Sequence, residues 1–178
     1  MIEATSATQQ STSDQSRVFA IQLNELLGDK DHATISVAES CTGGNVAHRI
    51  TSVPGSSTYF LGGVVSYANS AKTTLLGVST ELLDRYGAVS AECAAAMASG
   101  ARSAFRSDIA VSTTGIAGPE GGASTKPVGL VYFGLATDTE TQTEHRQFSG
   151  SRAEIIEAAS AFALELLVRA SETTTVKR

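Results

Sequence analysis

Apolar side chains recur at intervals of three or four residues in several parts of the chain, which is the spacing of one face of a helix. Over residues 17–27 the repeat ends at Gly28, and over 91–105 it follows Ser90, a residue type that favours helix N-caps. The pattern predicts helices at 17–27, 91–105 and 153–168, a helix that follows 40–44 and ends before Pro54, and short helices at 71–76 and 81–86.

Four other runs are rich in β-branched and apolar residues and lack a helical period, which predicts strands. They cover residues 34–39, 59–67, 108–113 and 128–136. The last of these is almost wholly apolar, as is typical of a central strand buried on both faces. Residues 144–148 can pair with it in antiparallel fashion across the polar link 137–143. The order of elements predicts a fold of the α/β class, a single three-layer α/β/α domain with a mixed sheet.

The length of 178 residues agrees with one domain and short tails. Residues 1–16 are rich in Ser, Thr and Gln and offer little apolar surface to bury, so we expect a disordered lead there. The folded domain is expected at 17–170, and a flexible tail at 171–178.

Composition excludes several classes of protein. With 42% hydrophobic and 17% charged residues the chain is globular, and its net charge of −5 argues against a general nucleic-acid-binding surface. The two cysteines and the absence of CxxC or HExxH spacing predict no metal site. No apolar run approaches the ~20 residues of a membrane span, and the N-terminus lacks the basic and apolar regions of a secretion signal. We expect a cytoplasmic protein with reduced thiols and with neither a membrane nor a nucleic-acid partner.

Polar, glycine-rich segments follow two of the expected strands, at 39–44 and 113–122. Ligands of open α/β sheets bind at the carboxyl ends of strands, so both segments can line one crevice. Ser40 stands at a strand-to-helix turn whose backbone N–H groups can receive negative charge, which makes Thr42, Gly43 and Gly44 expected substrate contacts. The turn suits a nucleophile beside an oxyanion hole, a phosphate cradle, or a serine that only caps a helix.

The second segment, 114–122, holds more glycines than an economical turn needs. Because each glycine costs ordering entropy, close approach of the backbone to an anionic ligand is a reasonable explanation, with Gly115 and Gly118 as expected contacts. A flexible surface loop is the alternative. Lys126, at the end of this loop, is expected to be a solvated loop lysine.

Several motifs along residues 17–168 occur together: AESCTGG at 38–44, VPGSS at 53–57, GGVVSYAN at 62–69, GAVS at 87–90, TGIAGPEGG at 114–122 and KPVG at 126–129. In order and spacing they closely resemble the CinA C-terminal domain family, whose characterised members are nicotinamide-nucleotide amidases. The resemblance implies a stand-alone three-layer α/β/α domain, a dimer or higher homo-oligomer, and no metal or cofactor. It also implies a small nucleotide substrate: nicotinamide mononucleotide would be hydrolysed to nicotinate mononucleotide and ammonia.

The same resemblance implies roles for particular residues. The family's nucleophile matches Ser40, its general base Lys72 and its active-site tyrosine Tyr67. Substrate contacts are implied at Thr114 and Arg152. Two positions depart from the family pattern, because Ser151 replaces an Asp and Ile156 replaces a second Arg. The loss at Ile156 is expected to weaken phosphate affinity or to alter the helix surface.

Amide hydrolysis by a serine needs a base, because an amide is a poor electrophile. Lys72 can be that base if burial lowers its pKa, and a substrate pyridinium beside it would lower the pKa further. His48 is expected at the surface or in the core, and Cys41 as a small buried hydrophobe. Tyr67 can orient Lys72 or carry protons to the leaving ammonia, and a core aromatic is the alternative. Two other functions remain open: a non-catalytic nucleotide-sensing or partner-binding domain, and hydrolysis of another nucleotide or amide.

Overall fold

The computed structural model describes residues 3–28 and 32–173, with side chains from residue 14 onward. Within this part of the chain, five strands form one sheet in the order β2-β1-β3-β4-β5. The strands are β1 (Ile35–Glu39), β2 (Phe60–Val65), β3 (Ile109–Gly115), β4 (Leu130–Ala136) and β5 (Thr141–Gln147). The helices are α1 (Glu3–Leu27), α2 (Asn45–Thr51), α3 (Asn69–Leu76), α4 (Thr80–Tyr86), α5 (Ala91–Phe105) and α6 (Arg152–Thr173), with a short 3₁₀ helix at Ser56–Thr58.

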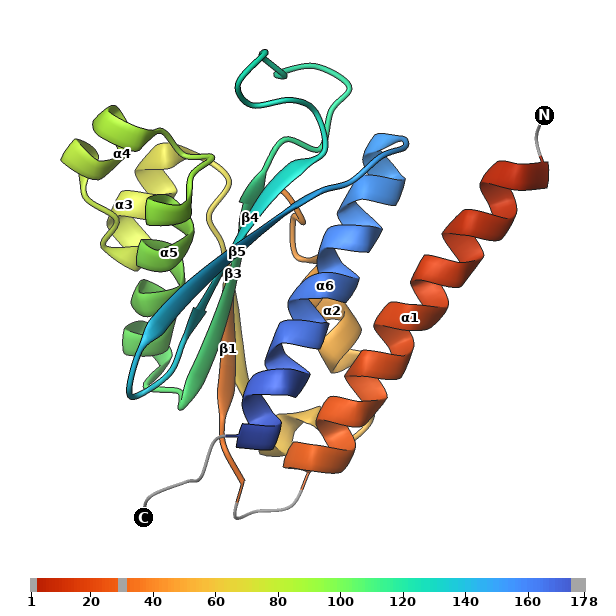
Figure 1. Ribbon diagram of the computed structural model, residues 1–178. Helices are drawn as coiled ribbons and strands as arrows, with labels where there is room; N and C mark the ends of the chain where they lie inside the picture. Colours follow the sequence, from red (N-terminus) through yellow and green to blue (C-terminus); the bar gives the residue numbers. More distant parts are fainter. Residues whose placement is uncertain (1–2, 29–31, 174–178) are drawn as a thin grey trace.

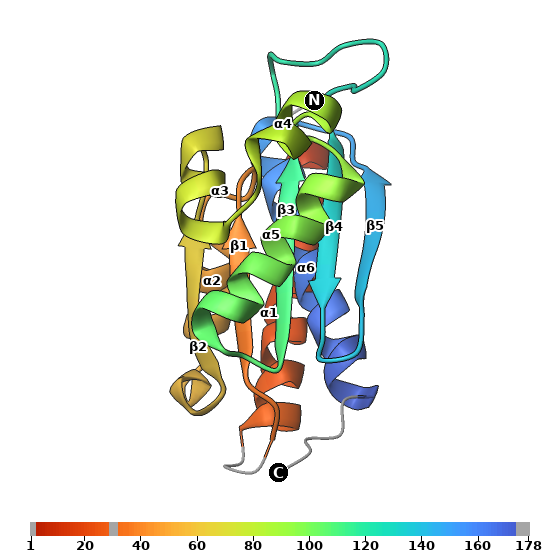
Figure 2. The ribbon, with the colours of Figure 1, turned by 90° about the vertical axis from the view of Figure 1, so that its left-hand side faces the viewer.

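The sheet is mixed. β1 lies between β2 and β3 and is parallel to both, whereas β4 is antiparallel to β3 and to β5. Helices α1, α2 and α6 cover one face, and α3, α4 and α5 cover the other (Figure 1). These layers confirm the predicted α/β/α architecture. The parallel strands β1 and β3 point to the same end of the sheet, above which the loop 116–129 arches (Figure 2).

Each face of the sheet has its own apolar core. The larger core joins the sheet to α1, α2 and α6 and includes Phe133, whose ring meets those of Phe148 and Phe162 edge to face. The smaller core joins the sheet to α3, α4 and α5. Gly134 in β4 permits the close packing of α5, because a Cβ there would lie 2.3 Å from the backbone oxygen of Ala94. Burial of both faces explains why the central strands are almost wholly apolar.

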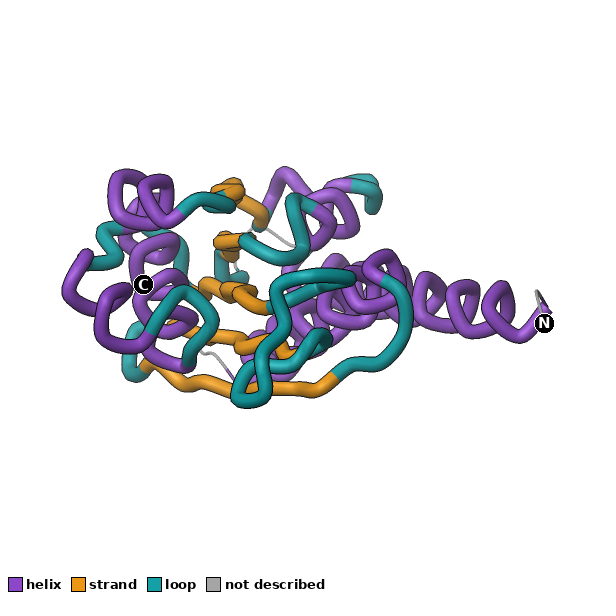
Figure 3. Tube along the Cα trace, turned by 90° about the horizontal axis from the view of Figure 1, so that it is seen from above, coloured by secondary structure: helices purple, strands orange, loops and turns teal. Residues whose placement is uncertain are grey.

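The N-terminal expectation was wrong. Residues 3–16, predicted to be a disordered lead, belong to α1. Ser16 is fully buried and donates a hydrogen bond from Oγ to Glu157 Oε1 of α6 at 2.6 Å. The stretch contains no Gly or Pro, so nothing in it ends the helix that the apolar repeat begins. Seen from above, the N-terminal turns of α1 extend beyond the body of the domain (Figure 3).

Two C-terminal boundaries also differ from the prediction. Helix α6 continues to Thr173, so residues 171–173 of the predicted flexible tail are helical, and 174–178 lie outside the described residues. Strand β5 begins at Thr141, inside the predicted polar link. It is an edge strand with mostly exposed side chains, so it carries no alternation of apolar and polar residues that would mark it. Among the described helices, none has the length and apolarity required to cross a bilayer.

Candidate active site

Six of the ten expected site residues meet in a cavity of about 210 Å³ at the carboxyl ends of β1, β2 and β3. Its lining comes from the turns after these strands, from α3, from the link between α4 and α5, and from the start of α6: Ser40, Cys41, Tyr67, Asn69, Lys72, Ala88, Val89, Thr114, Gly115, Ala117 and Arg152. Another cavity, of about 230 Å³, lies between β4, β5 and the end of α6. Its lining includes no Ser, Cys or Lys, so the first cavity is the candidate for nucleophilic chemistry.

Ser40 and Lys72 form the centre of this cavity. The Lys72 side chain is 1% exposed, and its Nζ lies 3.0 Å from Ser40 Oγ. The same nitrogen donates hydrogen bonds to the backbone oxygens of Ser66 (2.7 Å) and Tyr67 (3.1 Å). A neutral amine has two N–H bonds and one lone pair. In the charged form Nζ can donate to all three oxygens, whereas in the neutral form the two carbonyls accept both N–H bonds and the lone pair is left for the serine hydroxyl.

Burial lowers the pKa of Lys72 below its usual value, because an ammonium ion loses hydration in the interior. Within the described chain, no carboxylate bonds to its Nζ to restore the charged form. The side chain is therefore suited to accept a proton rather than to carry a permanent charge. A base of this kind next to a hydroxyl is the arrangement that activates a serine nucleophile.

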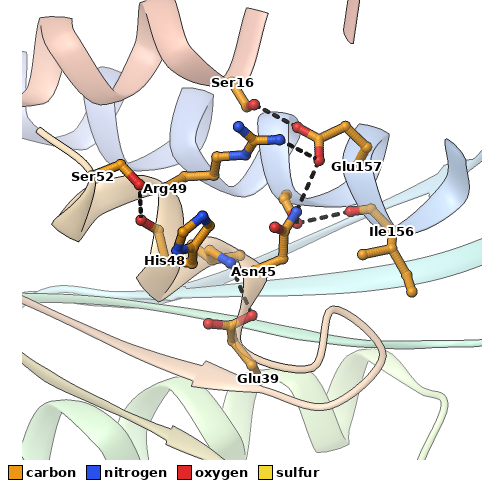
Figure 4. Close-up of polar contacts among 10 residues, drawn as sticks. Ser16, Glu39, Asn45, His48, Arg49, Ser52, Ile156 and Glu157 are labelled. Atoms are coloured by element: carbon orange, nitrogen blue, oxygen red, sulfur yellow. Dashed lines mark hydrogen bonds and ion pairs between the residues drawn. The ribbon is translucent and has the colours of Figure 1, made fainter. Parts of the chain in front are cut away.

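The neighbouring carboxylate, Glu39, accepts hydrogen bonds mainly from backbone N–H groups. It is 1% exposed and accepts hydrogen bonds from Thr42 Oγ1 (2.6 Å) and from the N–H groups of Gly44 (3.0 Å), Val46 (3.0 Å) and Ala47 (2.9 Å). Glu39 thus caps the start of α2 from within the sheet (Figure 4). Its bonds hold the turn that carries Ser40, which agrees with the expected role as a hydrogen-bond acceptor.

The expected run of free amides after Ser40 is only partly present. The Ser40 N–H donates to Thr113 O at 2.9 Å, the Gly43 N–H to Ser40 O at 3.2 Å, and the Gly44 N–H to Glu39. In the described structure, the N–H groups of Cys41 and Thr42 donate to no other residue. Cys41 lines the cavity, so its amide is the one available to a developing oxyanion.

Three expected substrate contacts lie outside the cavity. Thr42, Gly43 and Gly44 line a separate shallow depression beside the start of α6. The hydroxyl of Thr42 is used internally, because it donates to Glu39 and accepts from Thr113 Oγ1 at 2.7 Å. The turn was correctly expected beside Ser40, but Glu39 takes the place that an anionic ligand would need.

Arg152, Tyr67 and the loop 116–129 form the mouth of the cavity. Arg152 donates from Nη1 to Gly118 O at 2.8 Å and from Nη2 to the Tyr67 hydroxyl at 3.0 Å. Tyr67 is 60% exposed, so the core-aromatic alternative is wrong. Its hydroxyl is bonded to Arg152, and its backbone oxygen is the atom that holds Lys72. The start of α6 is fixed by Ser151, whose N–H and hydroxyl both donate to Glu154 Oε2 at 2.7 Å.

Thr114 and Gly115 end β3 at the cavity wall. Thr114 Oγ1 donates to the backbone oxygen of Ala88 at 2.6 Å. Gly115 is required for strand pairing, because a Cβ there would lie 2.6 Å from Leu130 O of β4. Ala88 and Val89 were not expected in the site, although the GAVS motif that contains them was a signal that could have indicated it.

The alternative nucleophile and base fit less well. Burial raises the pKa of the Cys41 thiol to about 12, which keeps it protonated and weakly nucleophilic. His48 is exposed on α2, beside the shallow depression and outside the cavity. Ile156 lines the same depression and packs partly against the apolar core.

Behind the Ser40 turn, a polar cluster joins three helices (Figure 4). The Glu157 carboxylate of α6 accepts from Ser16 Oγ of α1 and from Asn45 Nδ2 of α2 (3.1 Å), and pairs with Arg49 at 2.8 Å. Burial acts to raise the Glu157 pKa, but the bonds from Ser16, Arg49 and Asn45 outweigh it and hold the pKa below its usual value. The carboxylate therefore holds the first residue of α2 from the side of α6, whereas Glu39 accepts from the backbone of Gly44, Val46 and Ala47 on the side of the sheet.

Comparison with known proteins agrees with this fold. The model of the family described as the CinA C-terminal domain matches residues 18–171. A CinA-like protein of Geotalea uraniireducens (strain Rf4) is 56% identical over 134 residues, which cover 75% of this chain and 32% of that protein. The chain spans about a third of the length of the curated relatives it matches.

Solved structures are similar over most of their length. The competence/damage inducible protein CihA from Agrobacterium tumefaciens is 38% identical with a TM-score of 0.79, over 89% of this chain and 94% of that chain. The competence damage-inducible protein A (ComA) from Klebsiella pneumoniae subsp. pneumoniae is 30% identical with a TM-score of 0.85, over 90% of this chain and 99% of that chain.

Proposed function

Because the chain belongs to the CinA C-terminal domain family, we propose that it is an amidohydrolase that converts nicotinamide mononucleotide and water to nicotinate mononucleotide and ammonia. The observation that carries this proposal is the 3.0 Å contact between the buried Lys72 amine and the Ser40 hydroxyl. A nucleophile and a base at this distance, in a cavity lined by a residue whose backbone amide donates to no other residue, suit acyl transfer.

In the first half of the reaction, Ser40 Oγ attacks the carboxamide carbon and its proton passes to Lys72 Nζ. The carbonyl oxygen becomes an oxyanion, which the N–H of Cys41 is available to receive. The Lys72 ammonium then gives its proton to the amide nitrogen, the C–N bond breaks, and ammonia leaves. The products of this half are ammonia and an ester on Ser40.

In the second half, water replaces the amide. Lys72 takes a proton from the water as its oxygen attacks the ester carbon, and returns that proton to Ser40 Oγ as the ester bond breaks. The carboxylic acid loses its own proton to solvent and leaves as nicotinate mononucleotide. Lys72 is neutral again, held by the same two backbone carbonyls.

Thr114 supports the orientation of the amide. Its hydroxyl proton is committed to Ala88 O at 2.6 Å, so the oxygen faces the cavity as an acceptor. A carboxamide NH₂ can donate to an acceptor but a carbonyl oxygen cannot. Thr114 therefore favours the pose in which the leaving nitrogen, not the carbonyl oxygen, lies on its side.

Arg152 supports a substrate that carries a phosphate. Its two hydrogen bonds go to neutral oxygens, Gly118 O and the Tyr67 hydroxyl, so its charge is not neutralised by a carboxylate among the described residues. A phosphate at the mouth would gain charge-assisted hydrogen bonds from the guanidinium. The net charge of −5 makes a general electrostatic attraction an unsuitable source of this affinity.

Ammonia release tests the proposal directly. We expect the protein to release ammonia from nicotinamide mononucleotide faster than from nicotinamide riboside, and far faster than from nicotinamide. The Ser40→Ala protein should bind the mononucleotide but release no ammonia from it. Cys41→Ala serves as the matched control and should retain turnover. Binding without ammonia release by the native protein would favour a nucleotide-sensing domain, and release from other amides alone would indicate a different substrate.

A further inference from the structure

One wall of the cavity is made by a segment without regular secondary structure. Residues 86–89, which we call the strap, run from Tyr86, the last residue of α4, toward the N-cap of α5 and place Ala88 and Val89 in the cavity lining. Residues 87–89 of the strap belong to no strand or helix that would hold their backbone in place. The position of the strap therefore depends on hydrogen bonds from side chains outside it.

Three consecutive carbonyls of the strap each accept a hydrogen bond from a side chain. Lys126 Nζ donates to Tyr86 O at 2.9 Å, Ser90 Oγ to Gly87 O at 2.9 Å, and Thr114 Oγ1 to Ala88 O at 2.6 Å. The donors come from the loop 116–129, the N-cap of α5 and the end of β3. Solvent could satisfy these carbonyls in a surface connection. Three side-chain donors in a row therefore indicate that the bonds fix the position of the strap.

Lys126 ties two separate walls of the cavity together. The loop that carries it also supplies Ala117 to the lining and is held at Gly118 O by Arg152. Lys126 itself is fixed by paired backbone bonds with Ala123, at 2.9 and 3.1 Å. Its Nζ fits closely over the strap, since a Cβ at Gly87 would lie 3.2 Å from it. Lys126 lies on the loop as expected and its hydrogen bond to Tyr86 O is at an exposed site, but the side chain also contacts the strap.

We propose that Lys126 is a positioning residue of the active site, which clamps the loop 116–129 to the strap and thereby sets the wall formed by Ala88 and Val89. It does not touch Ser40 or Lys72, whose contacts come from β1, β2 and α3. Loss of the clamp should loosen substrate binding more than it slows the chemical steps. This kinetic consequence rests on the proposed amidase function, whereas the clamp itself does not.

The test combines a reaction-independent readout with kinetics on the full chain. In Lys126→Met, hydrogen exchange of the backbone amides of residues 87–90 in the ligand-free protein should speed up about 10-fold, as expected for loss of one charged hydrogen bond. KM for nicotinamide mononucleotide should rise about 10-fold while kcat stays within about 2-fold. Lys126→Arg should restore most of both, because a guanidinium still donates to a carbonyl. The matched control is Arg106→Met, which removes one positive charge from the exposed C-cap at the far end of α5 and should change neither.

Each outcome supports or overturns the proposed role of Lys126. Unchanged exchange at residues 87–90 in Lys126→Met would show that the lysine does not hold the strap and would overturn the proposal. Faster exchange with a fall in kcat and a constant KM would overturn the positioning of the binding wall. If the native protein releases no ammonia, the proposed function fails, and the exchange measurement still accepts or rejects the clamp.

Discussion

Two charge-bearing groups on either side of the Ser40 turn, the buried Lys72 and the half-buried Glu157, have opposite surroundings. Lys72 contacts a hydroxyl and two backbone carbonyls, none of which carries a charge, and burial lowers its pKa. Glu157 receives two hydrogen bonds and an ion pair from three side chains, which keep its pKa below the usual value. The lysine is left without a counter-charge, whereas the glutamate is fully compensated.

The difference indicates that Lys72 serves the reaction and that Glu157 serves the stability of the fold. Burial without a counter-charge lowers the pKa of an amine and so favours the neutral form, which is the form that can take a proton from Ser40. A compensated carboxylate stays ionised and holds α1, α2 and α6 together. Variants at the first group should therefore remove activity and spare the fold, and variants at the second should do the reverse.

The largest effect is expected at Lys72. Lys72→Met should lower kcat for nicotinamide mononucleotide on the order of 10³-fold or more, because no other base contacts Ser40 in the described structure. Lys72→Arg should be equally inactive, since a guanidinium does not give up a proton near neutral pH. Steady-state ammonia release measures both. An active arginine variant would mean that position 72 supplies only positive charge. The claim that Lys72 acts as a base, in contrast to the ionised Glu157, would then fail.

Arg152 lies between the two extremes, because it is exposed and, among the described residues, bonded only to neutral oxygens. Arg152→Ala should raise KM for the mononucleotide about 10- to 100-fold, as expected for a charged hydrogen bond. KM for the riboside, which has no phosphate, should barely change. Arg152→Lys should fall between, because it keeps the charge and loses the bidentate geometry. An unchanged ratio of the two substrates in Arg152→Ala would remove this residue from the phosphate site.

Glu157→Gln should change stability and leave catalysis nearly intact. We expect the free energy of unfolding at pH 7 to fall by about 1–2 kcal/mol and kcat to stay within about 2-fold. Because the folded pKa lies below the unfolded value of about 4.3, the carboxylate stabilises the fold above that pH, and its contribution is lost as the pH falls through the folded pKa. Urea unfolding should therefore show a difference from the native protein that shrinks below about pH 4. Glu172→Gln, on the exposed end of α6, is the control and should have almost no effect.

Sequence alone was sufficient for the four apolar strands, because strand hydrophobicity is a local signal, whereas the roles of Ser40 and Lys72 came from the resemblance to the CinA C-terminal domain family. It did not predict which oxygens hold Lys72, since the carbonyls of Ser66 and Tyr67 reach it only through the path of the chain from β2 into α3. The burial of Ser16 depends on Glu157, which lies 141 residues later in the chain.

The glycine-rich turn illustrates the same limit. Its glycines predicted exposed amides for a ligand, but the side chain of Glu39 bends back and takes those of Gly44 and two residues of α2. A carboxylate next to the nucleophile in sequence carries no mark that tells whether it faces the substrate or the backbone. That choice is made by tertiary packing around the start of α2.

The most direct test of the uncompensated lysine is the pH dependence of kcat/KM and of kcat for nicotinamide mononucleotide. Both should rise with pH through a single acid limb whose pKa lies well below the about 10.4 of a free lysine, because Lys72 must be neutral to accept the Ser40 proton. The limb seen in kcat should lie lower than that seen in kcat/KM, since the pyridinium of the bound substrate repels the ammonium form. An acid limb near 10.4, or one that does not move between the two profiles, would contradict the assignment of Lys72 as a substrate-tuned base.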